Sequence, residues 1–362
     1  MIIVHFTPTY HPVIGGIESV VKSLATQMAS LNHRVYVICL SRHTLVSDSA
    51  REITADGVSV LYFTHYDIFS PSRISRLSKV LRSADILHLH DPKLGLLVAI
   101  ALTLLPKTKK YLTTHGGFYH HNRFPLIKKL YASTWARYAL GKLNTVFAIS
   151  EADFLAFSRL SPVPNVRLSL NVVRMNPFGV DPAVHPPGVR NWLYWGRTSS
   201  NKNLVSLLNF LMFLNNNDVH IVLHVCSSYP LQDLIAFAKQ HGLTNVFFYH
   251  KPDNSHIASL INQSSVFVLP SSYEGFGLTL VEAASSGLLP IFNDISPLNT
   301  VFPSDVGLAL DFSDFRSSLV AFLEYEMIVS SDQSTFVTDA IAASQVYSPK
   351  RRVEEILSVY LS

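Results

Sequence analysis

Short runs of consecutive apolar residues alternate along the chain with longer stretches in which apolar residues recur every three or four positions. The short runs are typical of strands buried on both faces, and the longer stretches are typical of amphipathic helices. Such an alternation favours parallel sheets with crossover helices. We expect strands at residues 2–6, 34–40, 58–63, 85–90, 110–114, 145–149, 192–195, 220–225, 246–249, 266–269, 288–292 and 306–310, and helices at residues 17–31, 72–81, 151–159, 204–214, 231–241, 255–263, 278–286, 315–325 and 350–361.

The pattern is interrupted by a proline-rich segment near the middle of the chain. Pro182, Pro186 and Pro187 make residues 182–188 a semi-rigid linker rather than a loose tether. The length of 362 residues suits two domains, and the 48% hydrophobic content allows each domain to bury a core. We therefore expect two α/β domains, residues 1–181 and residues 189–346.

The stretch from residue 271 to residue 287 joins a buried strand, a glycine loop and a helix that ends at Gly287. The unpaired N–H groups and the dipole at such a helix start favour a phosphate. Glu274 lies in the loop and Glu282 about one turn into the helix. Because carboxylates repel phosphate, both are better suited to accept hydrogen bonds from sugar hydroxyls. The stretch predicts a nucleotide-sugar site, and a helix cap with a solvated Glu is the alternative.

Two other loops share this position between a strand and a helix. Arg197 and Lys202 flank a turn that also contains Gly196, and two cations there suit a diphosphate, although a plain surface loop is the alternative. Gly15 and Gly16 precede the first helix, where glycine lets the backbone approach a ligand closely or simply makes a tight turn.

Histidines mark two strands of the first domain. His115 follows a strand, and the carboxyl ends of parallel strands are where open α/β sheets bind ligands. His88 and His90 alternate onto one face of their strand, which is one possible arrangement for a metal site. No third ligand lies near them in sequence. We therefore expect them to line an interdomain cleft or to form local hydrogen bonds.

Composition and charge narrow the possible partners. Residues 106–143 carry eight Lys and Arg, interleaved with aromatic residues, and no Asp or Glu, whereas the net charge of the chain is only +4. A basic amphipathic segment suits an anionic membrane or a lipid-linked diphosphate, and a solvated basic face is the alternative. The rest of the chain is net acidic and has no nucleic-acid motif, so we expect no nucleic-acid partner.

Three further observations bear on the compartment. Cys39 and Cys226 are far apart in apolar runs, which predicts buried thiols in a reducing compartment. The chain enters a strand directly after Met1, without a basic region, so we expect no signal peptide. The longest apolar run, residues 94–105, is too short to span a bilayer and predicts a buried helix.

Four motifs in order resemble the retaining GT-B glycosyltransferases of family GT4. They are Gly15-Gly16, His115-Gly116-Gly117, Arg197 with Lys202, and Glu274 with Glu282. The resemblance implies two Rossmann-like α/β domains whose parallel sheets face each other across a cleft. By the same analogy, a C-terminal helix at about residues 347–362 packs back on the first domain. The turn at residues 177–179 departs from the family pattern, and we assign it no role.

The resemblance also implies roles for individual residues. Glu274 would contact hydroxyls of the transferred sugar, and Glu282 would hold the ribose. The catalytic residues would be His115, Arg197, Lys202 and Glu274. The donor-binding residues would be Gly15, Gly16, Arg197, Lys202, Glu274, Gly275, Phe276, Gly277, Leu278 and Glu282. Acceptor or membrane contacts would come from His120, His121, Arg123, Lys128 and Lys129.

The expected activity is glycosyl transfer with retained configuration. The chain is similar to family members that move mannose from GDP-mannose, in α linkage, to a polyprenyl-diphosphate-linked oligosaccharide in exopolysaccharide assembly. No Asp-x-Asp motif is present, so we expect no metal or other cofactor, and the absence of a Gly-x-Gly-x-x-Gly loop argues against a dehydrogenase. We expect a cytoplasmic enzyme, peripheral on the inner face of the membrane. The alternatives are a GT4 enzyme with a UDP-sugar donor, a GT-B sugar-nucleotide epimerase, or a non-enzymatic protein that binds anionic lipid.

Overall fold

The chain forms two compact units, each built around its own sheet. Unit 1 comprises Met1–Val173 and Pro349–Ser362, and unit 2 comprises Arg174–Ser348. The structure is a computed structural model and describes residues 1–11, 13, 15–40, 51–53, 56–63, 71–91, 105, 107–115, 137–160, 165–182, 185–303 and 305–362.

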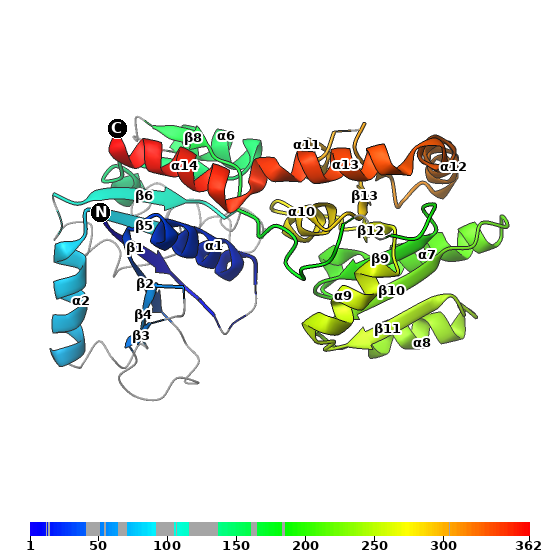
Figure 1. The fold of residues 1–362 in the computed structure, drawn as a ribbon, viewed down its shortest axis with the longest axis horizontal. Coiled ribbons are helices and arrows are strands. Elements are labelled where there is room, and N and C mark those ends of the chain that lie inside the picture. The colour runs from blue at the N-terminus through cyan, green and yellow to red at the C-terminus, as the bar shows by residue number, and fades with distance from the viewer. Residues whose placement is uncertain are drawn as a thin grey trace. The chain divides into compact units, whose positions relative to one another are not determined.

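The sheet of unit 1 has the strand order β3-β4-β2-β1-β5-β6-β7-β8 (Figure 1). Every pair is parallel except β3 with β4. The first strand, β1, lies near the middle because the chain runs outward on one side of it and then resumes on the other side with β5. The strands are β1 (Ile2–Thr7), β2 (Arg34–Leu40), β3 (Arg51–Ile53), β4 (Ser59–Phe63), β5 (Ile86–His90), β6 (Lys109–Thr113), β7 (Thr145–Ala148) and β8 (Val166–Leu168).

The last helix of the chain belongs to unit 1, where it packs beside α1 (Figure 1). Tyr360 ties it to the sheet, because its hydroxyl lies 2.5 Å from Nδ1 of the buried His88. Lys109 Nζ donates to the carbonyl of Tyr360 at 3.0 Å. Within the described residues, the helices of unit 1 are α1 (Gly16–Ser30), α2 (Pro71–Ser83), α5 (Arg137–Leu140), α6 (Glu151–Leu160) and α14 (Pro349–Leu361).

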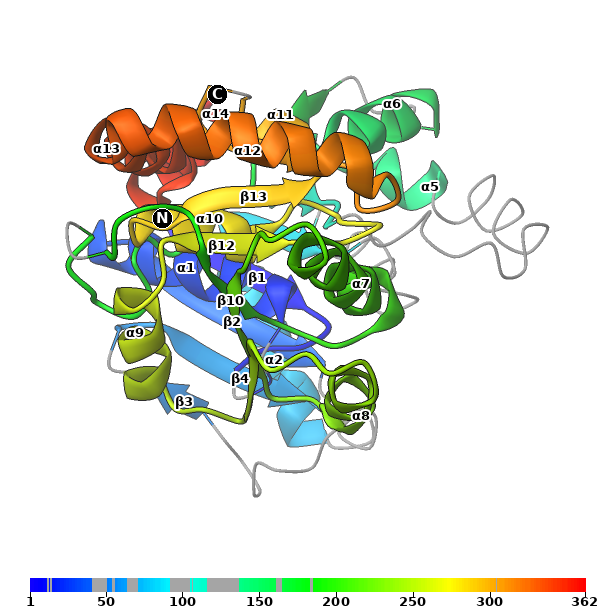
Figure 2. The ribbon, with the colours of Figure 1, turned by 90° about the vertical axis from the view of Figure 1, so that its right-hand side faces the viewer.

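The sheet of unit 2 is fully parallel, in the order β11-β10-β9-β12-β13-β14. Helices cover both of its faces, with α7 and α8 on one side and α9 on the other (Figure 2). The strands are β9 (Asn191–Trp195), β10 (Val222–Ser227), β11 (Val246–His250), β12 (Val266–Leu269), β13 (Leu289–Asn293) and β14 (Leu308–Leu310). The helices are α7 (Leu204–Asn215), α8 (Gln232–Gln240), α9 (Asn254–Asn262), α10 (Leu278–Ser285), α11 (Leu298–Val301), α12 (Phe315–Ser331) and α13 (Gln333–Ser344), with 3-10 turns η3 (Ser200–Lys202) and η4 (Gln345–Tyr347).

Several elements escaped the sequence pattern, including β3 and α13. Strand β3 has three residues, too few for a period to show, and α13 has no strong apolar stripe. Unit 2 begins at Arg174, directly after unit 1 ends at Val173. The backbone N–H of Asn176 donates to Ser285 Oγ at 2.8 Å, and this bond joins the segment after β8 to helix α10.

Both cysteines are free and buried, as the sequence predicted. Burial is the main factor that raises the pKa of each thiol to about 12. Among the helices of the described ranges, none has the length and apolar character needed to cross a bilayer. The apolar run at residues 94–105 lies outside the described residues except for Leu105.

Candidate functional site

The strand order of unit 2 reverses direction next to β9. This strand is followed in sequence by β10 on one side, whereas β12 pairs with its other side. Open α/β sheets bind ligands at such a reversal, outside the carboxyl ends of the two strands. The loop after β9 holds Arg197 and Lys202, and the loop after β12 holds Glu274, so the topology brings these two expected motifs together.

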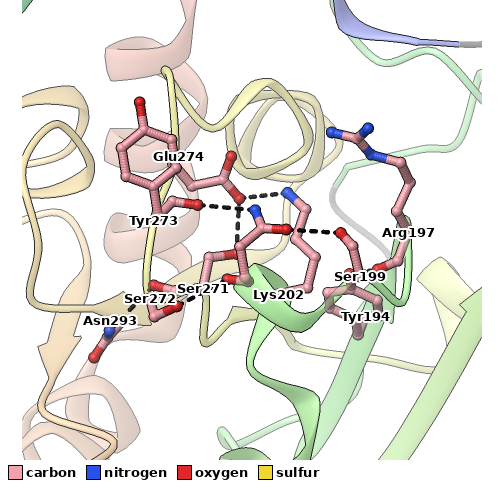
Figure 3. Close-up of polar contacts among 10 residues, drawn as sticks. Tyr194, Arg197, Ser199, Lys202, Ser271, Ser272, Tyr273, Glu274 and Asn293 are labelled. Atoms are coloured by element: carbon pink, nitrogen blue, oxygen red, sulfur yellow. Dashed lines mark hydrogen bonds and ion pairs between the residues drawn. The ribbon is translucent and has the colours of Figure 1, made fainter. Parts of the chain in front are cut away.

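Hydrogen bonds fasten the two loops to each other (Figure 3). The N–H of Ser272 donates to the carbonyl of Asn201 at 2.9 Å, and Asn201 Nδ2 donates to the carbonyl of Tyr273 at 3.2 Å. From the next strand, Asn293 Nδ2 donates to the carbonyl of Ser271 at 3.1 Å. These bonds fix the separation of the two loops and hence the positions of the charged side chains on them.

Lys202 and Glu274 form an ion pair across the two loops (Figure 3). Lys202 Nζ lies 2.5 Å from Glu274 Oε1, and each side chain is only 11% exposed. Ser271, which is fully buried, donates from Oγ to the same carboxylate oxygen at 2.7 Å. Arg197 is exposed, and no contact joins it to Glu274 in this view. The predicted site residues Lys202 and Glu274 are therefore in direct contact, with Arg197 on the same loop as Lys202.

The glycine loop before α10 contains two glycines, of which only one lacks room for a side chain. Gly277 caps the helix with φ +92°, and a Cβ there would lie 2.5 Å from Leu298 Cδ2. A Cβ on Gly275 would meet nothing within 4 Å. The ring of Phe276 is buried against Tyr347, which leaves only its backbone for a ligand. Leu278 begins the helix, whose first N–H groups have no intrahelical acceptor.

Glu282 lies on α10 and is only partly exposed. Burial raises the pKa of its carboxyl to about 7, against a hydrogen bond from Trp195 and the charge of Arg174, which both lower it. At neutral pH the group is therefore divided between a carboxylate that accepts hydrogen bonds and a carboxylic acid that also donates one.

The glycine pair of unit 1 lies at the start of α1. Gly15 is the N-cap residue and Gly16 the first helical residue. A Cβ on Gly15 would collide with the carboxylate of Glu18, which also accepts a hydrogen bond from Thr9 Oγ1. Because this contact involves the flexible end of the Glu18 side chain, which can shift, it does not by itself require glycine at position 15.

A cluster of histidines lies on three neighbouring strands of unit 1. His90 Nδ1 is 2.9 Å from His115 Nε2, and His90 Nε2 is 3.0 Å from His5 Nδ1. His88 stacks on His90, with ring centroids 4.4 Å apart. No third ligand lies near His88 and His90 in sequence, but in the folded chain His5 does. His5 comes beside them because β1 pairs with β5, and ring nitrogens of these three residues lie within 4.8 Å of one another.

Several expected residues lie outside the described part of the chain. They are Gly116, Gly117, His120, His121, Arg123, Lys128 and Lys129. Within the described part of the basic segment, Lys109 and Lys110 make contacts inside unit 1 rather than with solvent. Lys109 donates to the carbonyl of Tyr360, and Lys110 is only 5% exposed. Lys107 and Lys142 are exposed.

Sequence reasoning missed the residues that hold the charged groups in place. Ser271 and Asn201 stand in the motif loops, where polar residues are ordinary and give no signal of their own. His5 carried a signal that was available, since it is a polar residue within the apolar run at residues 2–6. A buried polar side chain in a strand needs a hydrogen-bond partner, and this requirement predicts a polar neighbour on an adjacent strand.

Comparisons with known proteins cover both units. The Glycosyltransferase Family 4 profile matches residues 14–173, and the Glycosyl transferases group 1 profile matches residues 183–317. Two relatives, from Xanthomonas oryzae pv. oryzae and Xanthomonas campestris, are named GDP-mannose:cellobiosyl-diphosphopolyprenol alpha-mannosyltransferase. Each is 32% identical over 305 residues, which cover 82% of this chain and 80% of the relative.

The solved structure of Anabaena HepE in complex with UDP superposes with a TM-score of 0.77. The match covers 99% of both chains at 16% identity, so it is evidence for a shared fold and not for a shared function. Its extent, with the two parallel α/β units, confirms the expected GT-B fold. Two family profiles and relatives above 30% identity along four fifths of the chain lead to one conclusion: this protein belongs to the family 4 glycosyltransferases.

Proposed function

We propose that this glycosyltransferase moves mannose from GDP-mannose, with retained α configuration, to a disaccharide carried on a polyprenyl diphosphate. The main structural support is the contact between Lys202 and Glu274 where the strand order of unit 2 reverses. The names of the two Xanthomonas relatives support the choice of donor and acceptor.

In the proposed donor site, positively charged side chains and backbone N–H groups would bind the diphosphate. Lys202 has three N–H donors and gives one to Glu274, so it can also contact a phosphate oxygen. Arg197 can add a bidentate contact, and the N–H groups at the start of α10 add further donors. These groups would stabilise the negative charge that develops on the leaving diphosphate.

Two carboxyl groups would hold the sugar rings. Glu274 would accept from hydroxyls of the transferred sugar, and Glu282 would hold the ribose. Because Glu274 is already held by Lys202 and Ser271, it is better placed to orient the sugar than to attack it. We therefore propose a front-face reaction, in which the acceptor hydroxyl enters on the side from which the diphosphate departs. His115 of unit 1 would donate to a hydroxyl of the transferred sugar.

The acceptor side would lie at the inner surface of the membrane. The eight basic residues of residues 106–143, without any acidic residue, support attraction to anionic lipid. Since Lys109 and Lys110 are engaged inside unit 1, this attraction would depend on the exposed Lys107 and Lys142 and on the basic residues from Arg123 to Arg137.

The test is a panel of nucleotide sugars incubated with cellobiose on a polyprenyl diphosphate, with products read by mass spectrometry. We expect a gain of one hexose from GDP-mannose and none from UDP-glucose or UDP-galactose. Glu274→Ala should abolish the gain while binding to anionic vesicles persists. A gain from UDP-sugars alone would overturn the choice of donor, and an epimerised nucleotide sugar formed without acceptor would overturn transfer itself.

A further inference from the structure

We propose that His5 and His90 are positioning residues that fix the tautomer of His115, so that His115 presents Nδ1–H as a hydrogen-bond donor. The inference rests on the proposed function in one respect, namely that His115 contacts the transferred sugar. The three rings form a chain from the middle of the sheet to the end of β6, in the order His5, His90, His115.

The geometry of the chain is set by strand pairing. Strand β1 pairs with β5, which opposes His5 to His88, and β5 pairs with β6, which opposes His90 to Thr113. His90 therefore reaches His5 on one neighbour and His115, just past the end of the other neighbour. His5 and His90 are fully buried, so water cannot replace either partner.

All three rings are neutral at physiological pH. Burial lowers the pKa of His5 and of His115 to about 3. Burial is also the main factor that lowers the pKa of His90 well below its ordinary range, and neighbouring histidines add to it. A neutral imidazole has one N–H donor and one acceptor nitrogen, so the direction of one hydrogen bond dictates the direction of the next.

Only two directions satisfy both hydrogen bonds. In the first, His115 Nε2–H donates to His90 Nδ1, and His90 Nε2–H donates to His5 Nδ1. The proton of His5 is then on Nε2, and this N–H has no acceptor. In the second, His5 Nδ1–H donates to His90, and His90 Nδ1–H donates to His115, which leaves an acceptor at His5 Nε2. His5 Nε2 is buried and has no partner among the described residues. Because an orphaned buried N–H is rarer than an unused acceptor, the second direction is favoured, and it puts the proton of His115 on Nδ1.

Hydrogen bonds of the preceding residue also fix the backbone at His115. His115 has φ +50°, an uncommon conformation for a residue with a side chain, and its neighbours must maintain it. The preceding Thr114 donates from its N–H to the carbonyl of Phe147 and from Oγ1 to Asp153. His88, which packs against His90, is itself occupied by Thr113 and Tyr360 and takes no part in the chain.

The tautomer can be measured without substrate. In the full-length protein with ¹⁵N-labelled histidine, NMR should show Nδ1 of His115 as the protonated nitrogen and Nε2 as the acceptor, with the signals assigned by their loss in His115→Gln. His5→Leu and His5→Asn have nearly the same shape, but only Asn provides an N–H at the position of Nδ1. We expect His5→Asn to retain the tautomer and His5→Leu to give a mixture.

Kinetics should separate the two variants in the same way. We expect His5→Leu to lower kcat for transfer about tenfold with little change in the KM for the donor, and His5→Asn to stay within about threefold of the native enzyme. In a His115→Ala background, replacing His5 by Leu should have no further effect. His224→Phe, at a buried histidine of unit 2, is the control for packing damage and should leave the unit 1 tautomers unchanged.

Three outcomes would overturn the inference: a His115 protonated at Nε2, equal behaviour of the Leu and Asn variants, or a stoichiometric metal ion bound by His5, His88 and His90 in elemental analysis. These results do not depend on the donor. If the tautomer shifts as expected but no sugar is transferred, the proposed function fails and the positioning role of His5 and His90 stands.

Discussion

Lys202 and Glu274 are 72 residues apart in the chain, yet their charged atoms lie 2.5 Å from each other in unit 2. The cation follows β9 and the carboxylate follows β12, two strands that pair at the centre of the sheet. The pair keeps two little-exposed charges balanced, since either one alone would be costly to hold in this position. In the proposed function, the same contact would orient a donor for phosphate and an acceptor for sugar hydroxyls.

Replacing Lys202 by Met should remove the cation that we propose stabilises the leaving diphosphate. We expect kcat/KM for transfer to fall roughly 100-fold or more, the usual effect of losing one such donor. Steady-state assays with GDP-mannose measure it. Lys239→Met, at an exposed lysine of α8, is the matched control and should leave activity unchanged. A Lys202→Met enzyme with native kcat/KM would exclude this role.

The two glycines of the loop before α10 should respond differently to alanine. Gly277→Ala should destabilise unit 2 by about 1–3 kcal/mol, because the residue has φ +92° and its Cβ would collide with Leu298. Gly275→Ala should leave the unfolding midpoint unchanged, since a Cβ there meets open space. Urea unfolding of both variants measures the contrast.

Binding of GDP adds a second readout for Gly275. If a phosphate approaches the backbone of this loop, Gly275→Ala should weaken GDP binding in calorimetry at least several-fold while the fold is kept. Native affinity in this variant would place the diphosphate elsewhere.

Glu282 should make unit 2 less stable as pH rises. Its pKa is about 7 in the folded protein, compared with an ordinary value of 4.5, so the folded state binds the proton more tightly. Between about pH 4.5 and 7 the unfolding free energy should therefore fall, by at most about 1.4 kcal/mol per pH unit from this group. Chemical unfolding at pH 5 and at pH 7.5 measures the change.

Glu282→Gln is the control for this pH dependence. The glutamine cannot ionise, so the difference in stability between variant and native protein should favour the variant increasingly from pH 5 to pH 7.5. A difference that is constant with pH would show that Glu282 titrates at its ordinary pKa in the folded state.

Tyr360→Phe should loosen the attachment of α14 to unit 1. The substitution removes a buried hydroxyl and leaves His88 Nδ1 without its partner, which should cost about 1–2 kcal/mol. Hydrogen exchange of the α14 amides should accelerate accordingly. Tyr229→Phe, at a residue that is 45% exposed in unit 2, should leave exchange in α14 unchanged.

Sequence reasoning predicted most strands and helices because each has a characteristic pattern of apolar and polar residues over a short stretch of the chain. Runs such as residues 266–269 bury both faces of a strand, and Gly287 ends α10 where a helix stop was expected. The loops bearing Arg197, Lys202 and Glu274 were identifiable for the same reason, since a strand, a turn and a helix start follow one another directly. Short β3 and weakly patterned α13 lacked that local signal.

The sequence by itself determined the alternation of elements, the two-unit design and the charged residues in the loops after β9 and β12. Only the tertiary structure decided which side chains meet: Lys202 with Glu274, His5 with His90, and Tyr360 with His88. The physical reason is that helices and strands arise from the burial of side chains close in sequence. Hydrogen bonds and ion pairs between strands depend instead on sheet order and register, which join residues many positions apart.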